Sequence, residues 1–418
     1  MSLPNRHASV AQLNGTPRRR FYTGPNLERA ITIADLRARA HRLMPRFVLE
    51  YLEGGAEDEA TLYREREAFA EWRFLPRTLV DESHRDLKRE ICGREAEMPL
   101  VVAPTGLNGL FTHHADIKLA EGAARAGVPF VQSTMSTDPM DQVARVEGVR
   151  HWWQLYVFGG DEVWQELVRR ADACGCEALV LTTNSQTFGN REWDSRTRAS
   201  RSRPSVSTTI DAALHGRWFA STLASHGMPC FPNVLDFVPK QSHGFFESAF
   251  WIRDQMPRSL SWGTVAKIRA KWKRPFFIKG ILNLEDVRRA LDAGVDGIVL
   301  GSHGGRQMDW AGSALDILQD AREIVGDRLA LYMSGGVRRG TDMLKALALG
   351  ADVVMAGRAI LYGLCAGGAD GVERALAILK EETSNDLGLL GVPRLDALNS
   401  DLLIRPTSLP MATHHPAG

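Results

Sequence analysis

The feature that most constrains the fold of this chain is a repeated unit: a short apolar run, a polar or glycine-rich tip, and an amphipathic helix pattern. Eight apolar runs follow this scheme, at 98–106, 128–134, 150–157, 177–184, 274–280, 297–305, 328–336 and 352–358. The runs are apolar nearly throughout, as expected for strands buried on both faces of a parallel sheet. Helix patterns between them, such as 284–294 and 340–350, end in glycine, a common signal at helix C-termini.

Eight strand–helix units in about 260 residues predict an α/β fold of the (β/α)8 TIM-barrel type, whose usual length is about 250 residues. A doubly wound open sheet is the alternative, and it would require a GxGxxG turn after the first strand. That strand ends instead in Pro104-Thr105-Gly106, which disfavours the open sheet. We therefore place a barrel domain at 98–400.

Three further segments lie outside the barrel. Residues 31–97 follow a helical pattern with a stop at Gly54-Gly55, which predicts an N-terminal helical extension. Residues 1–30 hold five Arg against one Glu and predict a basic, disordered tail, with contact to an anionic surface as the alternative. We expect 401–418 to form a C-terminal tail.

An insertion at 195–261 follows the fourth strand and is too long for a simple connection. It carries eight Lys and Arg against four Asp and Glu. Its aromatic residues are Trp218, Phe219, Phe231, Phe237, Phe245, Phe246, Phe250 and Trp251. Aromatic and basic residues without a long apolar run suit a surface that lies on a membrane or a partner. The alternative is a lid that packs its aromatic side chains on the barrel mouth.

Composition excludes several classes of protein. The 51 Lys and Arg nearly balance 50 Asp and Glu, which argues against a dedicated nucleic-acid binder. Five Cys without a CxxC pair indicate neither a disulfide framework nor a zinc site, and they fit a reducing cytoplasm. No N-terminal apolar region resembles a secretory signal, and no run reaches the roughly 18 residues of a transmembrane helix. We expect a cytoplasmic protein, with peripheral contact at the inner face of the membrane as an open possibility.

Polar residues stand at the C-terminal tip of each predicted strand, which is where barrels of this type place their reactive groups. In chain order these residues are Thr105, Gly106, Ser133, Gln154, Tyr156, Thr182, Asn184, Arg191, Lys279, His303, Arg306, Gly335, Gly336, Arg339, Gly357 and Arg358. Ordinary loop polarity explains one or two such positions but not a complete ring. The ring therefore predicts a site at this end of the barrel.

The last two tips predict a phosphate site. SGGVRRG (334–340) places backbone N–H groups and Arg at a helix start, and AGR (356–358) repeats this one strand later. Barrels often bind phosphate after strands seven and eight in this way. No dinucleotide fingerprint is present, so a single phosphate is expected.

Four other side chains suggest acid–base chemistry on an anion. His303 can accept a proton near neutral pH, although a satisfied loop histidine is the alternative. Arg306 and Arg191 can each clamp a carboxylate. Lys279 ends an apolar strand, either as half of a buried ion pair or as a cation beneath an electron-rich cofactor.

Together these motifs resemble the FMN-dependent 2-hydroxy-acid dehydrogenase and oxidase family, over about 31–400. The matching segments are YLEGGAEDE (51–59), APTGLNG (103–109), QLY (154–156), GNRE (189–192), IKG (278–280), SHGGRQ (302–307), GGVRRGTD (335–342), KALALGA (345–351) and GRAILYGL (357–364). PTGLNG and the ALHGRW and HGMP segments of the insertion resemble most the mandelate dehydrogenase branch. In that branch the insertion holds the enzyme to the membrane.

The resemblance implies FMN as cofactor, no metal, and a role for each matched residue. Tyr51 and Tyr156 would face the substrate, Arg191 and Arg306 would bind its carboxylate, and His303 would be the base. Lys279 would lie at the N1/O2 edge of the flavin. The remaining cofactor contacts would be Pro104, Thr105, Gly106, Ser133, Gln154, Thr182, Gly301, Ser334, Gly335, Gly336, Arg338, Arg339, Gly357 and Arg358.

The implied reaction oxidises a 2-hydroxy acid, and a quinone, an electron carrier or oxygen then reoxidises the flavin. We also expect a homo-oligomer and no nucleic-acid partner.

Three departures from the family pattern qualify this expectation. Asn184 stands where the family has an Asp that pairs with the catalytic histidine, Ser334 replaces a ribityl-binding Asp, and Gly301-Ser302 replaces Ser-Asn. Asn can hydrogen-bond but brings no charge. The alternatives are therefore FMN-dependent oxidation of an amine or a modified amino acid in a biosynthetic pathway, or a weakly active flavin-binding scaffold.

Overall fold

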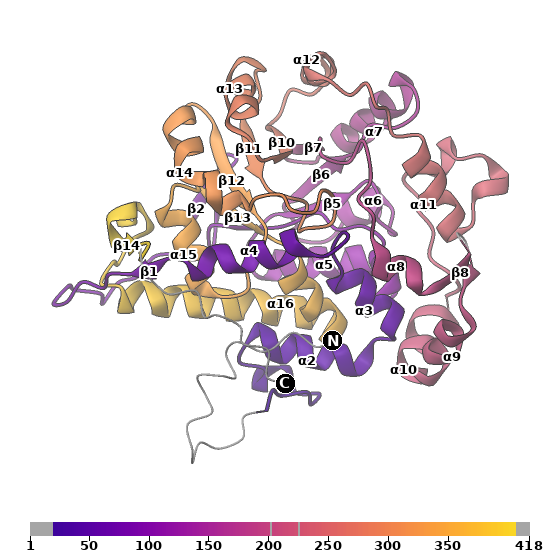
Figure 1. Ribbon diagram of the computed structural model, residues 1–418, viewed down its shortest axis with the longest axis horizontal. Coiled ribbons are helices and arrows are strands. Elements are labelled where there is room, and N and C mark those ends of the chain that lie inside the picture. The colour runs from indigo at the N-terminus through magenta and orange to yellow at the C-terminus, as the bar shows by residue number, and fades with distance from the viewer. Residues whose placement is uncertain (1–19, 201–202, 225, 407–418) are drawn as a thin grey trace, which may run out of the picture.

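A computed structural model describes residues 20–200, 203–224 and 226–406 of this chain (Figure 1). Its centre is a closed barrel in the order β10-β11-β12-β13-β4-β5-β6-β7, with every neighbouring pair parallel. The strands are β4 (Leu100–Val102), β5 (Phe130–Ser133), β6 (His151–Leu155), β7 (Leu179–Thr182), β10 (Phe276–Ile281), β11 (Gly297–Leu300), β12 (Ala330–Ser334) and β13 (Val353–Ala356). The predicted (β/α)8 barrel is confirmed, and the open sheet is excluded.

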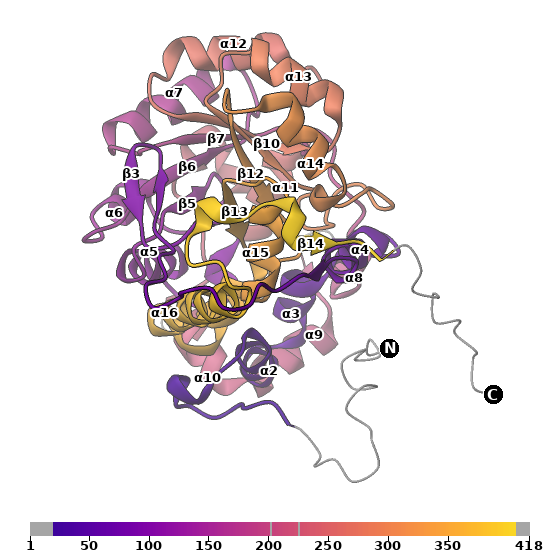
Figure 2. The ribbon, with the colours of Figure 1, turned by 90° about the vertical axis from the view of Figure 1, so that its left-hand side faces the viewer.

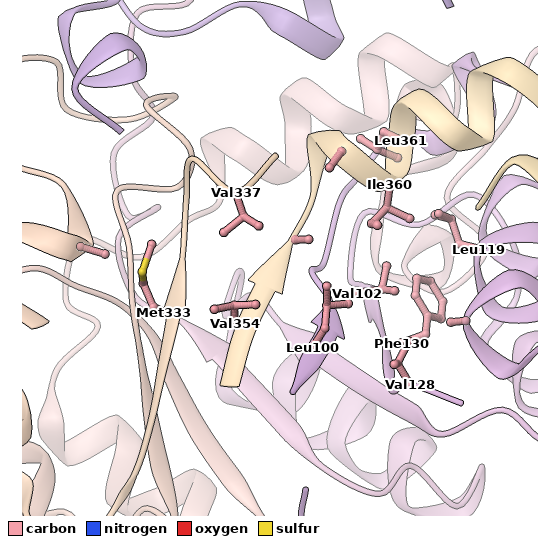
Figure 3. Close-up of a cluster of buried hydrophobic side chains, with 14 of the residues drawn as sticks. Leu100, Val102, Leu119, Val128, Phe130, Met333, Val337, Val354, Ile360 and Leu361 are labelled. Carbon is pink, nitrogen blue, oxygen red and sulfur yellow. The ribbon is translucent and has the colours of Figure 1, made fainter. Parts of the chain in front are cut away.

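Helices cover the outside of the barrel. They are α5 (Ala115–Arg125), α6 (Met140–Ala144), α7 (Asp161–Ala173), α12 (Trp262–Lys271), α13 (Leu284–Asp292), α14 (Ala314–Val325), α15 (Gly340–Ala348) and α16 (Arg358–Leu389). Apolar residues on the outward faces of the strands pack against them. Figure 3 shows Leu100 and Val102 of β4 and Phe130 of β5 between Leu119 of α5 and Ile360 of α16. This layer fixes the strands from outside.

The alternate strand residues form an apolar core inside the barrel. This core includes Val101, Val131, Trp152, Val180, Phe277, Val299, Tyr332 and Val353. A hairpin of β2 (Arg89–Ile91) and β3 (Arg94–Ala96) adds Ile91 and Ala96 to the same cluster. Arg150, directly before β6, donates to the Ile91 carbonyl over 2.6 Å. The hairpin therefore closes the N-terminal end of the barrel.

The N-terminal extension contains α2 (Ile33–Leu43), α3 (Arg46–Glu53) and α4 (Ala60–Ala70), as the helical pattern predicts. It is not wholly helical, because the β2–β3 hairpin also lies within 31–97. The hairpin was missed because a three-residue strand is too short to show a period of two.

The described fold extends into both segments expected as tails. β14 (Leu403–Ile404), drawn in yellow in Figure 2, pairs with β1 (Arg73–Phe74). Leu402 and Leu403 are buried. The fold therefore continues into the segment expected as a C-terminal tail. At the other end, residues 1–19 lie outside the described residues, while Ala30 is buried and the Tyr22 N–H donates to Asp35 Oδ1 over 2.7 Å.

The insertion is largely structured and stands to one side of the barrel, next to α3 (Figure 1). Its elements are α8 (Glu192–Arg196, which starts just before it), β8 (Arg198–Ser200), β9 (Arg203–Pro204), α9 (Val206–Leu214), α10 (Gly216–Phe219), a π-helical turn (Ala220–Ala224), short turns (Leu235–Phe237, Lys240–Ser242) and α11 (Phe245–Asp254). Trp218 and Phe231 are fully buried, and the Trp218 indole N–H donates to the Leu110 carbonyl over 2.8 Å. Among the described residues, no helix is both long and apolar enough to cross a membrane.

Candidate active site

The alternation that builds the apolar core also builds the mouth of the barrel. A strand residue two positions beyond an interior residue points to the same side, one layer nearer the C-terminal end. The pairs, with the interior residue first, are Val131 and Ser133, Trp152 and Gln154, Val180 and Thr182, Phe277 and Lys279, and Tyr332 and Ser334. Apolar packing below thus presents a polar ring above.

One cavity of about 1550 Å³ occupies the mouth and continues under the insertion. The residues singled out from the sequence that line it are Tyr51, Pro104, Thr105, Gly106, Ser133, Gln154, Tyr156, Thr182, Arg191, Lys279, His303, Arg306, Ser334, Gly335, Gly336, Arg338, Gly357 and Arg358. Asn184 and Gly301 do not line it but lie behind His303, where the Asn184 amide nitrogen donates to the Gly301 carbonyl. The structure therefore brings the predicted residues into one place.

His303 is held between two side chains. Its Nδ1 lies 3.1 Å from Asn184 Oδ1, and its Nε2 lies 3.4 Å from the Tyr156 hydroxyl. The Asn184 oxygen can only accept, so Nδ1 carries the proton and Nε2 is left as an acceptor. Burial, and then the charges of Lys279 and the site arginines, lower the pKa of His303 well below its ordinary value. The imidazole is therefore neutral near pH 7.

Two arginines lie beside this imidazole. Arg306 donates to the carbonyls of Tyr51 and Gly54 over 2.7 and 2.6 Å and pairs with Asp194 Oδ2 at 3.2 Å. Arg191 donates to the Arg306 carbonyl and to Gln307 Oε1, each over 3.1 Å. Burial, with the nearby Arg306 charge, lowers the pKa of Arg191 to about 10. The pair has more positive charge than Asp194 can balance, which favours binding of an anion.

Two tyrosines complete this part of the wall. The Tyr51 hydroxyl donates to the Gly106 carbonyl over 2.8 Å, and the Arg306 guanidinium lies 4.8 Å from the centre of its ring. The Tyr156 backbone N–H donates to the Thr134 hydroxyl over 3.0 Å, which fixes the residue that faces His303.

The predicted phosphate end contains two further cations. Arg358 donates to the carbonyls of Leu52, Gly304 and Gly54, and burial, with the charges of Arg306 and Arg338, lowers its pKa to about 9. The Arg338 guanidinium lies 5.8 Å from the centre of the Tyr362 ring.

One predicted member of the phosphate site is misplaced. Arg339 is exposed and pairs with Glu382 at 2.9 Å, away from the cavity. Arg339 is the N-cap residue of α15, and its side chain lies in solvent. Of the two neighbouring arginines, Arg338 lines the cavity.

The mouth also fits the flavin that the sequence implies. Gln154 Nε2 is a buried donor without a hydrogen-bond partner in the described part of the chain, as expected for a group that bonds a ring carbonyl. Gly335 and Gly336 have φ of +126° and +73°, and a Cβ on either would collide with Glu65. Glycine at these two positions therefore allows the loop after β12, which lines the cavity, to pack closely against α4. Burial lowers the pKa of Lys279, on the cavity wall, to about 8, while the charge of Glu65 acts in the opposite direction.

Three residues of this site were not singled out from the sequence. Gln307 bonds Arg191 and donates to the carbonyls of Asn184 and Thr187 over 2.7 and 3.0 Å. Asp194 and Glu65 are its acidic members. Gln307 ends the matched segment SHGGRQ, and Asp194 lies two residues after the matched segment GNRE, so the sequence could have indicated both. Nothing in the sequence around Glu65 indicated a place in the site.

Comparisons with known proteins agree with this geometry. The family model for FMN-dependent dehydrogenase matches residues 40–405. The chain is 38% identical to (S)-mandelate dehydrogenase of Pseudomonas putida over 89% of this chain and 93% of that protein. It is 34% identical to L-lactate dehydrogenase of Caulobacter sp. (strain K31), over 89% and 97%.

Solved structures give the same result. A crystal structure of the monotopic membrane protein (S)-mandelate dehydrogenase has a TM-score of 0.85 and 38% identity, covering 90% of this chain and 99% of that chain. A mandelate oxidase structure has a TM-score of 0.73 at 31% identity, covering 91% and 100%. The chain therefore belongs to the FMN-dependent 2-hydroxy-acid dehydrogenase family and is an FMN-dependent oxidoreductase on a (β/α)8 barrel.

Proposed function

We propose that this enzyme oxidises a 2-hydroxy acid, of mandelate or lactate type, to the 2-oxo acid. The observation that carries the proposal is the placement of an imidazole with a free Nε2 acceptor beside two half-buried arginines that exceed their acidic partner in charge. A substrate with a carboxylate next to a hydroxyl satisfies both halves of this arrangement. FMN, when bound, supplies the acceptor for the hydride, or its equivalent, at N5.

The side chains of this site have separate roles in binding the substrate and in transferring its proton. Arg191 and Arg306 hold the substrate carboxylate, which orients the hydroxyl toward His303. His303 Nε2 takes the hydroxyl proton, and the Asn184 oxygen fixes the required tautomer through Nδ1. The Tyr156 hydroxyl, 3.4 Å from Nε2, lies where it can bond the substrate oxygen.

The substrate carboxylate also assists the base. The site cations lower the pKa of His303, and a bound anion offsets part of their charge. His303 therefore becomes a better proton acceptor when an acid substrate is present than when the site is free of anions.

One observation favours a second candidate. Asn184 gives His303 no negative partner, so a proton stored on this imidazole is weakly stabilised. Oxidation of a neutral amine requires no such proton, because the nitrogen lone pair drives hydride release. An amine or modified amino acid is therefore the second substrate class, and a flavin-binding scaffold of weak activity is the third alternative.

Anaerobic bleaching of the bound flavin tests these proposals. The purified holoenzyme is mixed with a panel of 2-hydroxy acids, with 2-amino acids, and with the amides of the hydroxy acids as carboxylate-free controls. We expect bleaching by a hydroxy acid and not by its amide. Bleaching by amino compounds alone would favour the second candidate, and none at all would favour the scaffold.

We also propose that the insertion rests on a membrane. Val206, Ile210 and Leu214 recur every fourth residue of α9, so they share one face, and they are 77%, 56% and 79% exposed. Exposed Arg217 lies three residues after Leu214, in α10, and its charge suits anionic headgroups. The monotopic relative supports this arrangement, with the inner face of the membrane as the expected location.

Flotation with anionic liposomes tests the membrane contact. We expect binding that weakens with salt and is lost when the three α9 side chains become Ser, while the flavin spectrum is unchanged. Equal binding by both forms would instead favour a lid. The electron acceptor (quinone, carrier or oxygen) and homo-oligomer formation remain predictions, to be tested by reoxidation kinetics and by light scattering.

A further inference from the structure

A buried carboxylate lies next to the flavin site, on an element outside the barrel. Glu65 of α4 is 1% exposed. Its Oε1 accepts a hydrogen bond from the Ser302 hydroxyl, and its Oε2 accepts one from the Ser313 hydroxyl over 3.4 Å. Burying a carboxylate is costly unless it is hydrogen-bonded or paired, so its partners matter.

The hydrogen bonds suit its ionised form. Ser302 Oγ accepts the Gly305 N–H over 3.0 Å, and Ser313 Oγ accepts the Leu315 N–H over 3.3 Å. Each hydroxyl is thus free to direct its own proton toward Glu65, so that both carboxylate oxygens can act as acceptors. Burial raises the pKa of Glu65, whereas these hydroxyls and the charge of Arg358 act to lower it.

Glu65 contacts two parts of the site, the loop after β12 and the turn that carries His303. A Cβ on Gly335 would collide with the carboxylate, so the charge lies directly behind the loop after β12. That loop follows Ser334, which brings no charge of its own. On the other side, Ser302 connects Glu65 to the turn that carries His303 and Arg306.

The charge of Glu65 acts on two cations of the mouth, although no ion pair joins it to either of them in the described residues. It raises the pKa of Lys279, and the charge of Arg358 lowers the pKa of Glu65. The other carboxylates near these cations have partners of their own. Asp194 is paired with Arg306. Glu53, whose charge raises the pKa of Arg358, is paired with Arg37 and His41. The charge of Lys279 in turn lowers the pKa of His303.

We propose that Glu65 is a positioning residue of the flavin site, which supplies the counter-charge of Lys279 and, through Ser302, fixes the turn that carries His303. This rests on the assignment of Lys279 to the N1/O2 edge of FMN. Glu65 thus supplies a negative charge next to the flavin site from a helix of the N-terminal extension.

The reduction potential of bound FMN tests the first half without any substrate. It is measured against pH in wild-type holoenzyme, in Glu65→Gln and in Lys279→Met. Protonated Lys279 stabilises the reduced flavin, so the wild-type curve should change slope where Lys279 titrates, near pH 8. Glu65→Gln should move that change at least about one pH unit lower, because Lys279 loses its counter-charge. Lys279→Met should abolish it.

Two controls separate charge from shape. Glu67→Gln makes the same change on the exposed side of α4 and should leave the curve unmoved. Ser302→Ala keeps the charge but breaks the connection to the turn, so it should slow flavin reduction without moving the slope change. An unmoved slope change in Glu65→Gln would overturn the proposal. Failure of the substrate assignment would not affect these curves.

Thermal unfolding provides a test if Glu65→Gln does not fold. Lys279→Met leaves Glu65 buried without its partner, so the double variant with Glu65→Gln should unfold at a higher temperature than Lys279→Met alone. A double variant no more stable than the single one would contradict the pairing.

Discussion

The two ends of this barrel hold similar side chains in opposite circumstances. At the N-terminal end, buried Arg150 pairs with Glu177 at 3.1 Å and donates to the carbonyls of Ile91, Arg94 and Glu95. At the mouth, Arg191 donates to a carbonyl and an amide oxygen, with no carboxylate bonded to it in the described residues. A charge that the fold itself neutralises holds the structure together, whereas a charge that faces a cavity without neutralisation serves a ligand.

Two histidines extend the comparison. His151 at the base of β6 bonds Gln132 Oε1 at 2.9 Å, and burial alone lowers its pKa to about 4. His303 is half-buried, and four cations of the site contribute to its lowered pKa. Ligand anions can offset those cations, so binding changes the basicity of His303 and leaves that of His151 unaltered.

The largest expected effect comes from removing the base at the mouth. His303→Ala should slow anaerobic flavin reduction by about 10²–10⁴-fold, because a positioned general base contributes that much. Stopped-flow absorbance measures the rate, and the FMN content of the variant serves as control. An unchanged rate would remove His303 from the mechanism.

The two arginines should respond differently to the same change. Arg191→Met should weaken acid binding by about 10²-fold, since a charge-assisted hydrogen bond contributes about 1.5–3 kcal/mol. Arg150→Met should leave that affinity unaltered and lower the melting temperature, because it removes the hydrogen bonds that Arg150 donates to Glu177 and to the carbonyls of the β2–β3 hairpin. Titration of the flavin spectrum with substrate, together with thermal unfolding, checks both. Equal loss of affinity in the two variants would break the comparison.

Asn184→Asp should raise the pKa of His303 by placing an anion at Nδ1. Protonated His303 cannot act as base, so the acid limb of the pH–rate profile should move to higher pH. Above that limb the rate should rise, by about tenfold for one pKa unit if the base becomes correspondingly stronger. Loss of turnover with the true substrate would instead indicate an adaptation to that substrate and favour the amine candidate.

The smallest expected effect concerns stability at the closed end. His151 is held neutral by the fold, whereas in the unfolded chain its pKa is about 6.5, so the unfolded state binds more protons between pH 6.5 and 4. Stability from this group is therefore present above pH 6.5 and is lost as pH falls toward 4. His151→Gln should flatten that part of the unfolding free-energy profile in denaturant titrations, and an equally steep profile would exclude the contribution.

Much of the site followed from local sequence. Apolar strands buried on both faces and helices ending in glycine are readable in windows of a few residues, and the polar tip of each strand follows from its position. For this reason the barrel and the residues of the mouth, from Ser133 to Arg358, were predictable without coordinates.

What the tertiary structure decided depends on segments far apart in the chain. Glu65 lies in TLYREREAFA, where a glutamate looks like part of a solvated helix face, and only the packing of α4 against residues 302 and 313 buries it. The choice of Arg338 over Arg339 for the cavity depends on how α15 begins. Local patterns determine which elements form, because propensity and periodicity act over short distances. Whether a charge is neutralised depends on which distant group the fold places beside it.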